Sequence, residues 1–297
     1  MNFIKLEILI LISKYNKVTT VAERLGIKQP TVTFHMKSLE KLMDTTLFQN
    51  QGGYMILTEA GEALLHYANK IIRLKEEAER AMDEFNTLKR GTLKIGASYV
   101  PSTYLIPEIL RNMKNNYLQL QISITAIPSS KITQMILDHE LDAGIICSTG
   151  IDNLSIVYKK IYQDELGVVF SPESSLPQEG VLTEKSLLGQ TFVHHSKDSS
   201  TRQLVERWLK KRKMHFNSIV QLDSLEAIKR TLISTNWISI ISKKAVEKEI
   251  KSGELIYKAL PVENIERDIY LIYNKDRWIS PIMKKFFQIA ADSQWIK

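Results

Sequence analysis

The sequence predicts a mixed α/β protein built from an N-terminal winged helix-turn-helix, a long helix, and a larger part in which strands alternate with helices. Three observations predict this organisation. Apolar residues follow helical spacing through the first 57 residues, which end in a glycine-rich hairpin. Residues 58–89 contain no proline and only one glycine, Gly61. Beyond Gly91, short apolar runs alternate with helical patterns.

Three helices are predicted in the first segment. The first carries apolar residues at helical spacing, namely Ile4, Ile8, Leu11 and Ile12. The second begins near Thr19 and Thr20, either of which can cap its N-terminus, and Gly26 ends it. The third opens at Gln29 and Pro30, because proline in a first turn loses no needed hydrogen bond. Its apolar stripe consists of Val32, Met36, Leu39 and Met43. Two helices joined by a glycine-containing turn predict a helix-turn-helix.

A β-hairpin, the wing, is expected next. Residues 46–49 and 54–57 are its predicted strands, and they flank the turn Gln51-Gly52-Gly53. Glycines favour such a turn because they adopt positive φ without steric cost.

Residues 58–89 are predicted to form one long amphipathic helix. Its apolar seam, interrupted by Lys75, consists of Leu64, Ala68, Ile71, Ala78, Met82 and Phe85. The seam can be covered either by the chain itself or by a partner helix from a second subunit. The partner helix is the preferred interpretation, so we expect a homodimer.

The remainder predicts a parallel-rich α/β sheet, because strands alternate with helices. The predicted strands are residues 92–96, 121–126, 143–146, 166–170, 192–194, 218–222, 238–241 and 268–273. The predicted helices are residues 105–115, 131–138, 201–213, 225–234, 243–252 and 282–289.

Composition excludes several classes of protein. With 297 residues, 44% apolar, 25% charged, 12 Gly and 8 Pro, the chain is not collagen-like, low-complexity or wholly disordered. The net charge of +7 suggests nucleic acid, but the first 90 residues hold 13 Lys and Arg against 11 acidic residues, so charge alone argues little. A single Cys147 cannot form an intramolecular disulfide, which favours a reducing cytoplasm. The apolar run from Ile8 to Ile12 is too short for a signal peptide or a membrane span.

Short motifs recur along the chain in a specific order. The first 61 residues contain Thr20-Val21-Ala22-Glu23-Arg24-Leu25, Gln29-Pro30-Thr31-Val32-Thr33, Leu39-Glu40-Lys41-Leu42, Leu47-Phe48 and Leu57-Thr58-Glu59-Ala60-Gly61. Later motifs are Gly91-Thr92-Leu93-Lys94-Ile95-Gly96-Ala97-Ser98, Tyr104-Leu105-Ile106-Pro107, Glu140-Leu141-Asp142-Ala143-Gly144-Ile145, Ser200-Thr201-Arg202 and Glu226-Ala227-Ile228-Lys229. With these motifs the chain resembles the LysR-type transcriptional regulators along essentially its whole length.

The resemblance implies a cytoplasmic regulator, with no enzymatic activity, cofactor or metal. Residues 1–57 would bind promoter DNA, residues 58–90 would dimerise, and residues 91–297 would form a two-lobed, periplasmic-binding-protein-like effector-binding domain. Lobe I would comprise about residues 91–162 and 268–297, and lobe II about residues 163–267. The implied partners are double-stranded DNA, a small-molecule effector, further copies of the chain in a homodimer or a dimer of dimers, and RNA polymerase if the protein is an activator. No membrane partner is implied.

Some positions depart from the family pattern. Lys28 stands where a serine-like cap is usual, which weakens the cap but adds a positive charge. Phe34 and His35 occupy positions that are more often polar or basic. In the wing, the basic residues common in the family are replaced by Gln49, Asn50 and Gln51, which weakens the expected contact with the minor groove.

One face of the third helix is the predicted DNA-reading surface. With the apolar stripe turned to the core, Phe34 and Lys37 lie on the opposite side, and Thr33 on a flank. The candidate DNA-binding residues are Lys28, Gln29, Pro30, Thr31, Thr33, Phe34 and Lys37. Gln29 and Thr33 can reach base edges. Thr31 and Lys37 can contact phosphates or bases, and Phe34 can contact a thymine methyl group.

Two of these assignments have structural alternatives. Phe34 can equally pack on a neighbouring side chain of its own domain, and Lys37 can be an ordinary solvated lysine. If the protein is a dimer, its operator should be an inverted repeat with half-sites about one helical turn, or a multiple of it, apart.

Hydroxyl side chains follow predicted strands or precede predicted helices at three places. The candidate effector-binding residues there are Ser98, Ser102, Ser129, Ser130, Thr201 and Arg202. Free N–H groups at helix N-termini favour anions and polar groups, so a small polar or anionic effector is expected. Taken singly, each Ser or Thr can simply be a helix cap. Their convergence in one cleft is what the family resemblance implies.

Other features point to no additional chemistry. His194 and His195 are adjacent in a predicted strand, so their side chains point to opposite faces and cannot chelate a metal together, although one of them can face the cleft. Cys147 is interpreted as a small buried residue rather than a redox sensor, since the chain has no resolving cysteine. The enzyme motifs G-x-S-x-G, H-E-x-x-H, G-x-x-x-x-G-K-[ST] and G-x-G-x-x-G are missing. A solute-binding receptor remains the alternative function.

Overall fold

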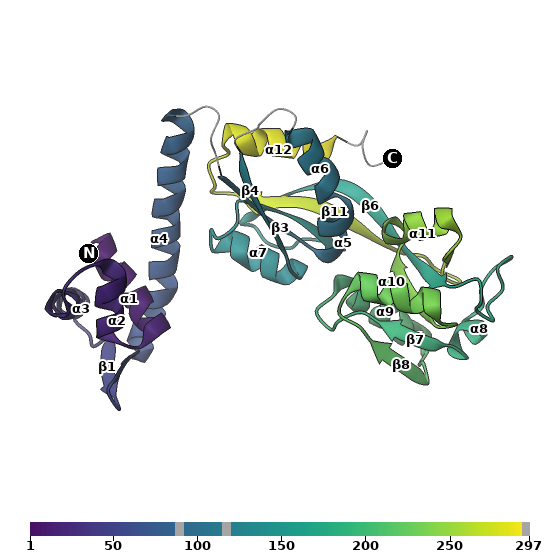
Figure 1. Cartoon of the computed structure of the whole chain (residues 1–297), viewed down its shortest axis with the longest axis horizontal. Helices are drawn as coiled ribbons and strands as arrows, with labels where there is room; N and C mark the ends of the chain where they lie inside the picture. Colours follow the sequence, from purple (N-terminus) through teal and green to yellow (C-terminus); the bar gives the residue numbers. More distant parts are fainter. Residues whose placement is uncertain (87–91, 115–119, 293–297) are drawn as a thin grey trace. The chain divides into compact units, whose positions relative to one another are not determined.

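The computed structural model describes residues 1–86, 92–114 and 120–292, and it divides into two compact units, Met1–Thr87 and Leu88–Lys297 (Figure 1). Each unit encloses its own apolar core. Among the described residues, every helix is too short or too polar to cross a membrane.

The first unit is the predicted winged helix-turn-helix with its long helix. Its elements are α1 (Phe3–Tyr15), α2 (Val18–Leu25), α3 (Gln29–Met43), β1 (Phe48–Gln51), β2 (Tyr54–Leu57) and α4 (Glu59–Asn86). Gly26 ends α2 in the left-handed conformation with φ of 64°, and Pro30 lies in the first turn of α3. Val32 and Leu39 of α3 pack with Ile12 of α1 in the core. The helix-turn-helix prediction is therefore confirmed.

The predicted threonine cap of α2 is wrong. The helix begins at Val18 with Lys17 as its N-cap residue, and no side chain caps it. Thr19 and Thr20 lie inside the first turn. The first hydrogen bond of the helix runs from the N–H of Val21, which is buried in the core, to the Lys17 carbonyl at 3.1 Å.

The first strand of the hairpin begins two residues later than predicted. Glu40 of α3 explains the shift, since its Oε1 accepts the N–H groups of Leu47 at 2.9 Å and Phe48 at 3.1 Å. The carbonyl of Thr46 accepts the Thr58 hydroxyl at 2.7 Å. These side-chain contacts hold the chain before Phe48 out of the strand, and β1 then pairs antiparallel with β2.

Part of the apolar seam on α4 is covered within the chain, which corrects the expectation that a partner helix covers it all. Ala68 is fully buried, and Leu64 and Ile71 pack against the core that α1 contributes to. Lys75 forms an ion pair with α1 on the same side of α4, with its Nζ 3.8 Å from Oε1 of Glu7. Large apolar side chains that stay exposed on the described part of α4 are Tyr67, Leu74 and Met82.

The second unit is an α/β structure around one large sheet (Figure 1). Its strands are β3 (Thr92–Ala97), β4 (Gln121–Ala126), β5 (Ala143–Ser148), β6 (Ile156–Phe170), β7 (Thr191–His194), β8 (Ser218–Gln221), β9 (Ile238–Ser242), β10 (Ile256–Lys258) and β11 (Ile265–Asn274). Its helices are α5 (Tyr99–Tyr104), α6 (Ile106–Lys114), α7 (Ser129–Leu137), α8 (Glu184–Leu188), α9 (Ser200–Arg212), α10 (Leu225–Ser234), the 3₁₀ helix η1 (Lys243–Val246), α11 (Glu247–Ser252) and α12 (Pro281–Ala291).

The sheet is parallel only toward its two ends. Its strand order is β4-β3-β5-β11-β6-β9-β7-β8, with β10 beside β6. β3 pairs parallel with β4 and β5, and β7 pairs parallel with β8 and β9. β11 is antiparallel to both β5 and β6, and β6 is antiparallel to β9. The expected parallel-rich sheet is therefore wrong at its centre, because the long strands β6 and β11 run against their neighbours there.

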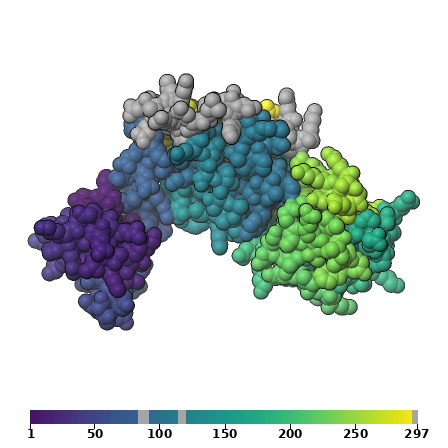
Figure 2. Space-filling model, in the orientation of Figure 1, coloured from purple at the N-terminus to yellow at the C-terminus, as the bar shows by residue number. Residues whose placement is uncertain are grey.

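The two ends of these long strands belong to two different apolar cores. One is built on β3, β5, α6 and α12, and the other on β7, β9 and α9. We call the part around the first core the first half and the part around the second core the second half. They form two masses in Figure 2, one in blue and teal and the other largely in green. The predicted lobe boundaries, after residues 162 and 267, fall inside the continuous strands β6 and β11.

Two glycines let α7 lie directly on the sheet. A Cβ atom at Gly96 of β3 would lie 2.8 Å from Cγ2 of Ile132, and one at Gly144 of β5 would lie 2.6 Å from the same atom. Only glycine permits this approach of Ile132, which is fully buried. The N-terminus of α7, which begins at Ser129, is thereby placed beside the end of β5.

Candidate functional site

The outer face of α3 carries the candidate DNA-binding residues. Those exposed to solvent are Lys28, Gln29, Pro30, Thr31, Phe34 and Lys37. Phe34 is 66% exposed, and its ring meets only the edge of His35 among the described aromatic rings, at 5.6 Å between centroids. The ring is therefore accessible to a contact outside the domain. Thr33 is half-buried, and its hydroxyl donates to the Gln29 carbonyl at 3.3 Å.

The wing is a tight hairpin with a polar tip. Gly52 and Gly53 have φ of 59° and 86°, as a two-residue turn of this kind requires. The side-chain oxygen of Asn50 accepts the N–H of Gly53 at 3.2 Å, so Asn50 stiffens the turn. Gln49 and Gln51 are exposed beside it. The wing tip therefore offers hydrogen-bonding groups, and Lys17 places a cation beside it, with its Nζ 5.4 Å from the centroid of the Tyr54 ring.

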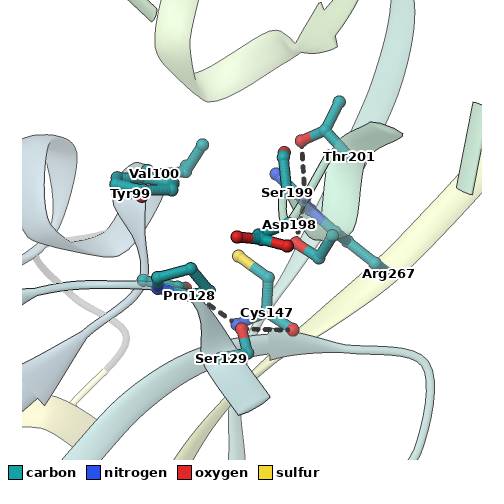
Figure 3. Close-up of a pocket in the computed structure, with 11 residues that line it drawn as sticks. Tyr99, Val100, Pro128, Ser129, Cys147, Asp198, Ser199, Thr201 and Arg267 are labelled. Carbon is teal, nitrogen blue, oxygen red and sulfur yellow. Dashed lines mark hydrogen bonds between the residues drawn. The ribbon is translucent and has the colours of Figure 1, made fainter. Parts of the chain in front are cut away.

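Ser98, Ser129 and Thr201, from three separate segments, line one pocket between the two halves of the second unit (Figure 3). This inner pocket has a volume of about 20 Å³, enough for one water molecule or a group of similar size. An outer pocket of about 330 Å³ adjoins it and shares Ser129, Cys147 and Ser200 with it. The candidate Ser130 lines the outer pocket. The two pockets together provide a cleft of a size that suits a small metabolite.

Hydrogen bonds fix the first half of the cleft. The N–H of Cys147 donates to the Ser98 hydroxyl at 3.0 Å, and the Ser129 hydroxyl donates to the Cys147 carbonyl at 3.0 Å. These bonds tie the ends of β3 and β5 to the start of α7. Burial raises the pKa of the Cys147 thiol above its ordinary value, so the thiol stays protonated. A protonated thiol is a poor nucleophile, which agrees with a structural interpretation of Cys147.

A buried ion pair fixes the second half. Arg267 of β11 and Asp164 of β6 face each other in register and are almost fully shielded from solvent. Nε of Arg267 donates to Oδ2 of Asp164 at 2.9 Å, and Nη2 lies 2.8 Å from the same oxygen without forming a hydrogen bond. Nη1 of Arg267 donates to the hydroxyls of Thr201 at 2.8 Å and Ser200 at 3.1 Å. The guanidinium therefore holds the N-terminus of α9 in place.

The helices α7 and α9, which begin at the cleft, lack a side-chain cap. Pro128 precedes α7 and Ser199 precedes α9, and neither forms a side-chain hydrogen bond to its helix. The residues that follow them, Ser129 and Ser200, line both pockets. Uncapped N–H groups and the helix dipole favour an anionic or polar group bound between these two N-termini.

Two predicted effector-site residues point elsewhere. Arg202 binds Glu206 at 2.6 Å, the His195 carbonyl at 3.1 Å and Gln221 at 2.8 Å. Ser102 donates its hydroxyl to the Tyr99 carbonyl at 2.9 Å, one turn into α5. Arg267, which does line the inner pocket, was not among the predicted site residues.

A sequence signal for this ion pair exists. Arg267 stands in phase with Ile265 and Ile269 along β11, and Asp164 stands in phase with Leu166 along β6. A charged residue at a position that strand alternation turns inward is a candidate for a buried pair.

The two adjacent histidines are not part of the cleft. His194 lines a separate apolar hollow beside α9, with Leu209 and Met214. Burial is the main cause that lowers the pKa of both His194 and His195 to about 4, so both are neutral at physiological pH. The neighbouring guanidiniums of Arg202 and Arg267 lower these pKa values further.

Comparison with known families agrees with the resemblance seen in the sequence. Residues 86–295 match the family model described as LysR substrate binding domain, and residues 3–62 match the one described as bacterial regulatory helix-turn-helix protein, lysR family. The chain belongs to the LysR family. This LysR-type protein is a transcriptional regulator with a DNA-binding and an effector-binding part, and it is not an enzyme. The alternative of a solute-binding receptor is not favoured.

Relatives of this LysR-type regulator span nearly the whole chain. The HTH-type transcriptional regulator YwqM of Bacillus subtilis strain 168 is 30% identical over 277 residues, which cover 92% of each chain. A probable RuBisCO transcriptional regulator of Trichormus variabilis is 28% identical over 291 residues, which cover 96% of this chain and 86% of the relative.

Solved structures of other LysR-family proteins share the fold. Full-length CbnR complexed with its target DNA aligns over 99% of this chain and all of its own, with a TM-score of 0.70 and 18% identity. Full-length OxyR from Pseudomonas aeruginosa aligns over 99% of this chain and 94% of its own, with a TM-score of 0.68 and 19% identity.

Proposed function

We propose that this LysR-type regulator binds promoter DNA as a homodimer, through the outer face of α3, and changes transcription when a small polar metabolite occupies the cleft. The observation that carries the DNA-binding part of the proposal is the exposed face of α3, which has both apolar and polar residues. Phe34 on this face is 66% exposed to solvent. Lys28, Gln29, Pro30, Thr31, Thr33 and Lys37 complete the proposed contact surface. A cytoplasmic location belongs to the same proposal.

The effector part of the proposal rests on the residues that meet at the inner pocket. Ser98, Ser129 and Thr201 contribute hydroxyl groups, and the uncapped N-termini of α7 and α9 contribute N–H groups. In this proposal residues 1–57 bind DNA, residues 58–90 dimerise and residues 91–297 bind the effector in two lobes, about 91–162 with 268–297, and about 163–267. A dimer of dimers and, for an activator, contact with RNA polymerase belong to the same proposal.

The DNA-binding function is tested by selecting sites from random double-stranded DNA with the full-length protein. We expect an inverted repeat to be enriched, with half-sites about one helical turn or a multiple of it apart. Footprinting on the native promoter region should protect the same sequence. No enrichment over random DNA would contradict the proposal.

Dimerisation is proposed to use the exposed side of α4. Leu74→Glu places a charge between Tyr67 and Met82, so we expect the dimer dissociation constant to rise about ten-fold or more. Sedimentation of the full-length protein measures this. Glu76→Gln, about half a turn around the helix, is the control and should leave the association unchanged. An unchanged dimer in Leu74→Glu would exclude this side of α4 as the interface.

The effector site is tested with Ser98→Ala, Ser129→Ala and Thr201→Ala combined in one chain. A metabolite that binds the folded protein raises its melting temperature, so a thermal-shift screen identifies the effector first. We expect the triple variant to bind that metabolite about ten-fold more weakly or worse, because each alanine removes a polar partner in the inner pocket. Ser252→Ala, at an exposed serine that lines neither pocket, is the control and should leave binding unchanged. Intact binding by the triple variant would exclude this site.

A further inference from the structure

The residues that line the inner pocket carry no net positive charge. Of the residues that line it, only Arg267 and Asp198 carry a formal charge. The guanidinium of Arg267 is already neutralised by Asp164, which is fully buried against it. The charge that the inner pocket leaves uncompensated is therefore the negative charge of Asp198.

Asp198 is free to bind a ligand. Its side chain is exposed and forms no hydrogen bond or ion pair with any residue in the described ranges 1–86, 92–114 and 120–292. Figure 3 shows its carboxylate reaching into the space beside Cys147, on the side where Thr201 and Arg267 meet. A carboxylate in this place can accept hydrogen bonds from an ammonium group of a ligand.

The same site also favours an anion. The N-termini of α7, a helix of 9 residues, and α9, a helix of 13 residues, meet there without side-chain caps. An effector that is only anionic would place its charge beside Asp198 and be repelled by it. A zwitterion satisfies both features, with its carboxylate between the helix N-termini and its ammonium group toward Asp198.

The outer pocket can bind a polar group at the far end of the ligand. The charged residues that line it are Arg207 and Asp152, and both are exposed. Arg207 has no partner among the described residues. Gln203, one turn earlier on α9, lines the same pocket. A guanidinium and an amide together suit a carboxylate or amide group at the far end of a short side chain.

We propose that the effector is an α-amino acid with an acidic or amide side chain. Its α-carboxylate binds at the N-termini of α7 and α9, its α-ammonium group binds Asp198, and its side chain extends through the outer pocket toward Arg207. The proposal rests on the proposed function of this cleft as the effector site, and it names the class of ligand.

The test measures binding of seven compounds to the full-length protein by thermal shift and calorimetry. Four are L-glutamate, L-glutamine, L-aspartate and L-asparagine. The others are 2-oxoglutarate and 2-hydroxyglutarate, which lack the amino group, and 4-aminobutanoate, which lacks the α-carboxylate. We expect at least one of the four amino acids to bind about ten-fold or more tightly than the three analogues, because each analogue loses one charged contact.

Asp198→Asn should weaken binding of that amino acid about ten-fold or more and leave the oxo and hydroxy acids no weaker than before. Asp223→Asn is a matched control, because Asp223 also directly precedes a serine N-cap, that of α10, and lies outside both pockets. It should change neither affinity. If Asp198 only stabilises the N-terminus of α9 through the helix dipole, both variants should show the same small change in stability. Neither variant should then change the ligand preference.

Two results would overturn the proposal. One is the failure of all four amino acids to bind at millimolar concentration. The other is binding of an acid without an amino group as tight as that of any amino acid. In the second case, loss of that binding in the triple variant at Ser98, Ser129 and Thr201 would leave the cleft as the effector site, so the ligand class alone would be wrong.

Discussion

Replacement of Arg267 by methionine is expected to lower the free energy of unfolding of the full-length protein by about 3–5 kcal/mol. The side chain is 3% exposed, and its partner Asp164 is fully buried, so the substitution leaves a carboxylate without a counter-charge in the interior. Of the side-chain hydrogen bonds to Asp164 from described residues, the one from the Ser242 hydroxyl to Oδ1, at 2.6 Å, would remain. Denaturant-induced unfolding measures the change. Ligand affinity should fall as well, because Thr201 loses the donor that positions it.

Two further variants separate the buried charge from lost packing. Asp164→Asn combined with Arg267→Met removes the uncompensated charge and should recover part of the lost stability. Arg111→Met breaks a solvent-exposed ion pair with Glu108 and should cost no more than about 1 kcal/mol. If the single and double variants at this pair are equally unstable, the buried charge is not the cause.

The N-terminal unit is predictable from sequence because its signals are local. Gly26 adopts the left-handed conformation that its place in the turn requires, and Pro30 occupies a first helical turn. The start of β1 was mispredicted because it depends on Glu40, a side chain from α3 that competes for the N–H groups of Leu47 and Phe48. Such a contact has no signature in the residues of the hairpin itself.

The centre of the sheet illustrates a different limit. Only the last five residues of β6 were predicted as strand, because Lys159, Lys160 and the acidic residues at 164 and 165 interrupt the apolar pattern before them. Its antiparallel pairing with β11 spans that charged stretch and gives Asp164 its partner. Apolar periodicity detects strands that bury hydrophobic side chains. It does not detect a stretch of strand whose buried side chain is charged and belongs to an ion pair.

The seam of α4 shows what spacing alone leaves open. Leu64, Ala68 and Ile71 were correctly placed on one apolar side of a helix, but the same pattern fits cover by α1 and cover by a second subunit. The candidate pocket has the same property. Ser98, Ser129 and Thr201 are predicted as hydroxyls at helix starts, and their meeting depends on the closeness of α7 and α9 between the two halves of the second unit.

Phe34→Ala is expected to weaken binding to the selected operator by about 1–3 kcal/mol, the usual cost of one lost base-pair contact. Stability should change by less than about 0.5 kcal/mol, because the ring is 66% exposed and fills no space in the core. Competition binding to the operator and thermal unfolding measure the two quantities. Lys37→Ala is the comparison, since loss of a phosphate contact weakens binding to all sequences alike and reduces the salt dependence.

Replacing single thymines of the operator by uracil tests the contact itself, because uracil lacks only the methyl group. If Phe34 packs on a thymine methyl, one such replacement costs the wild-type protein about 1 kcal/mol and costs Phe34→Ala nothing, since the partner is already gone. Equal losses in the two proteins at every position would show that Phe34 contacts no thymine methyl. A variant that binds weakly and also unfolds easily would assign Phe34 to its own domain, with His35 as its neighbour. We expect Phe34→Ala to keep its stability, and we expect the wild-type protein to lose affinity on uracil replacement at one thymine.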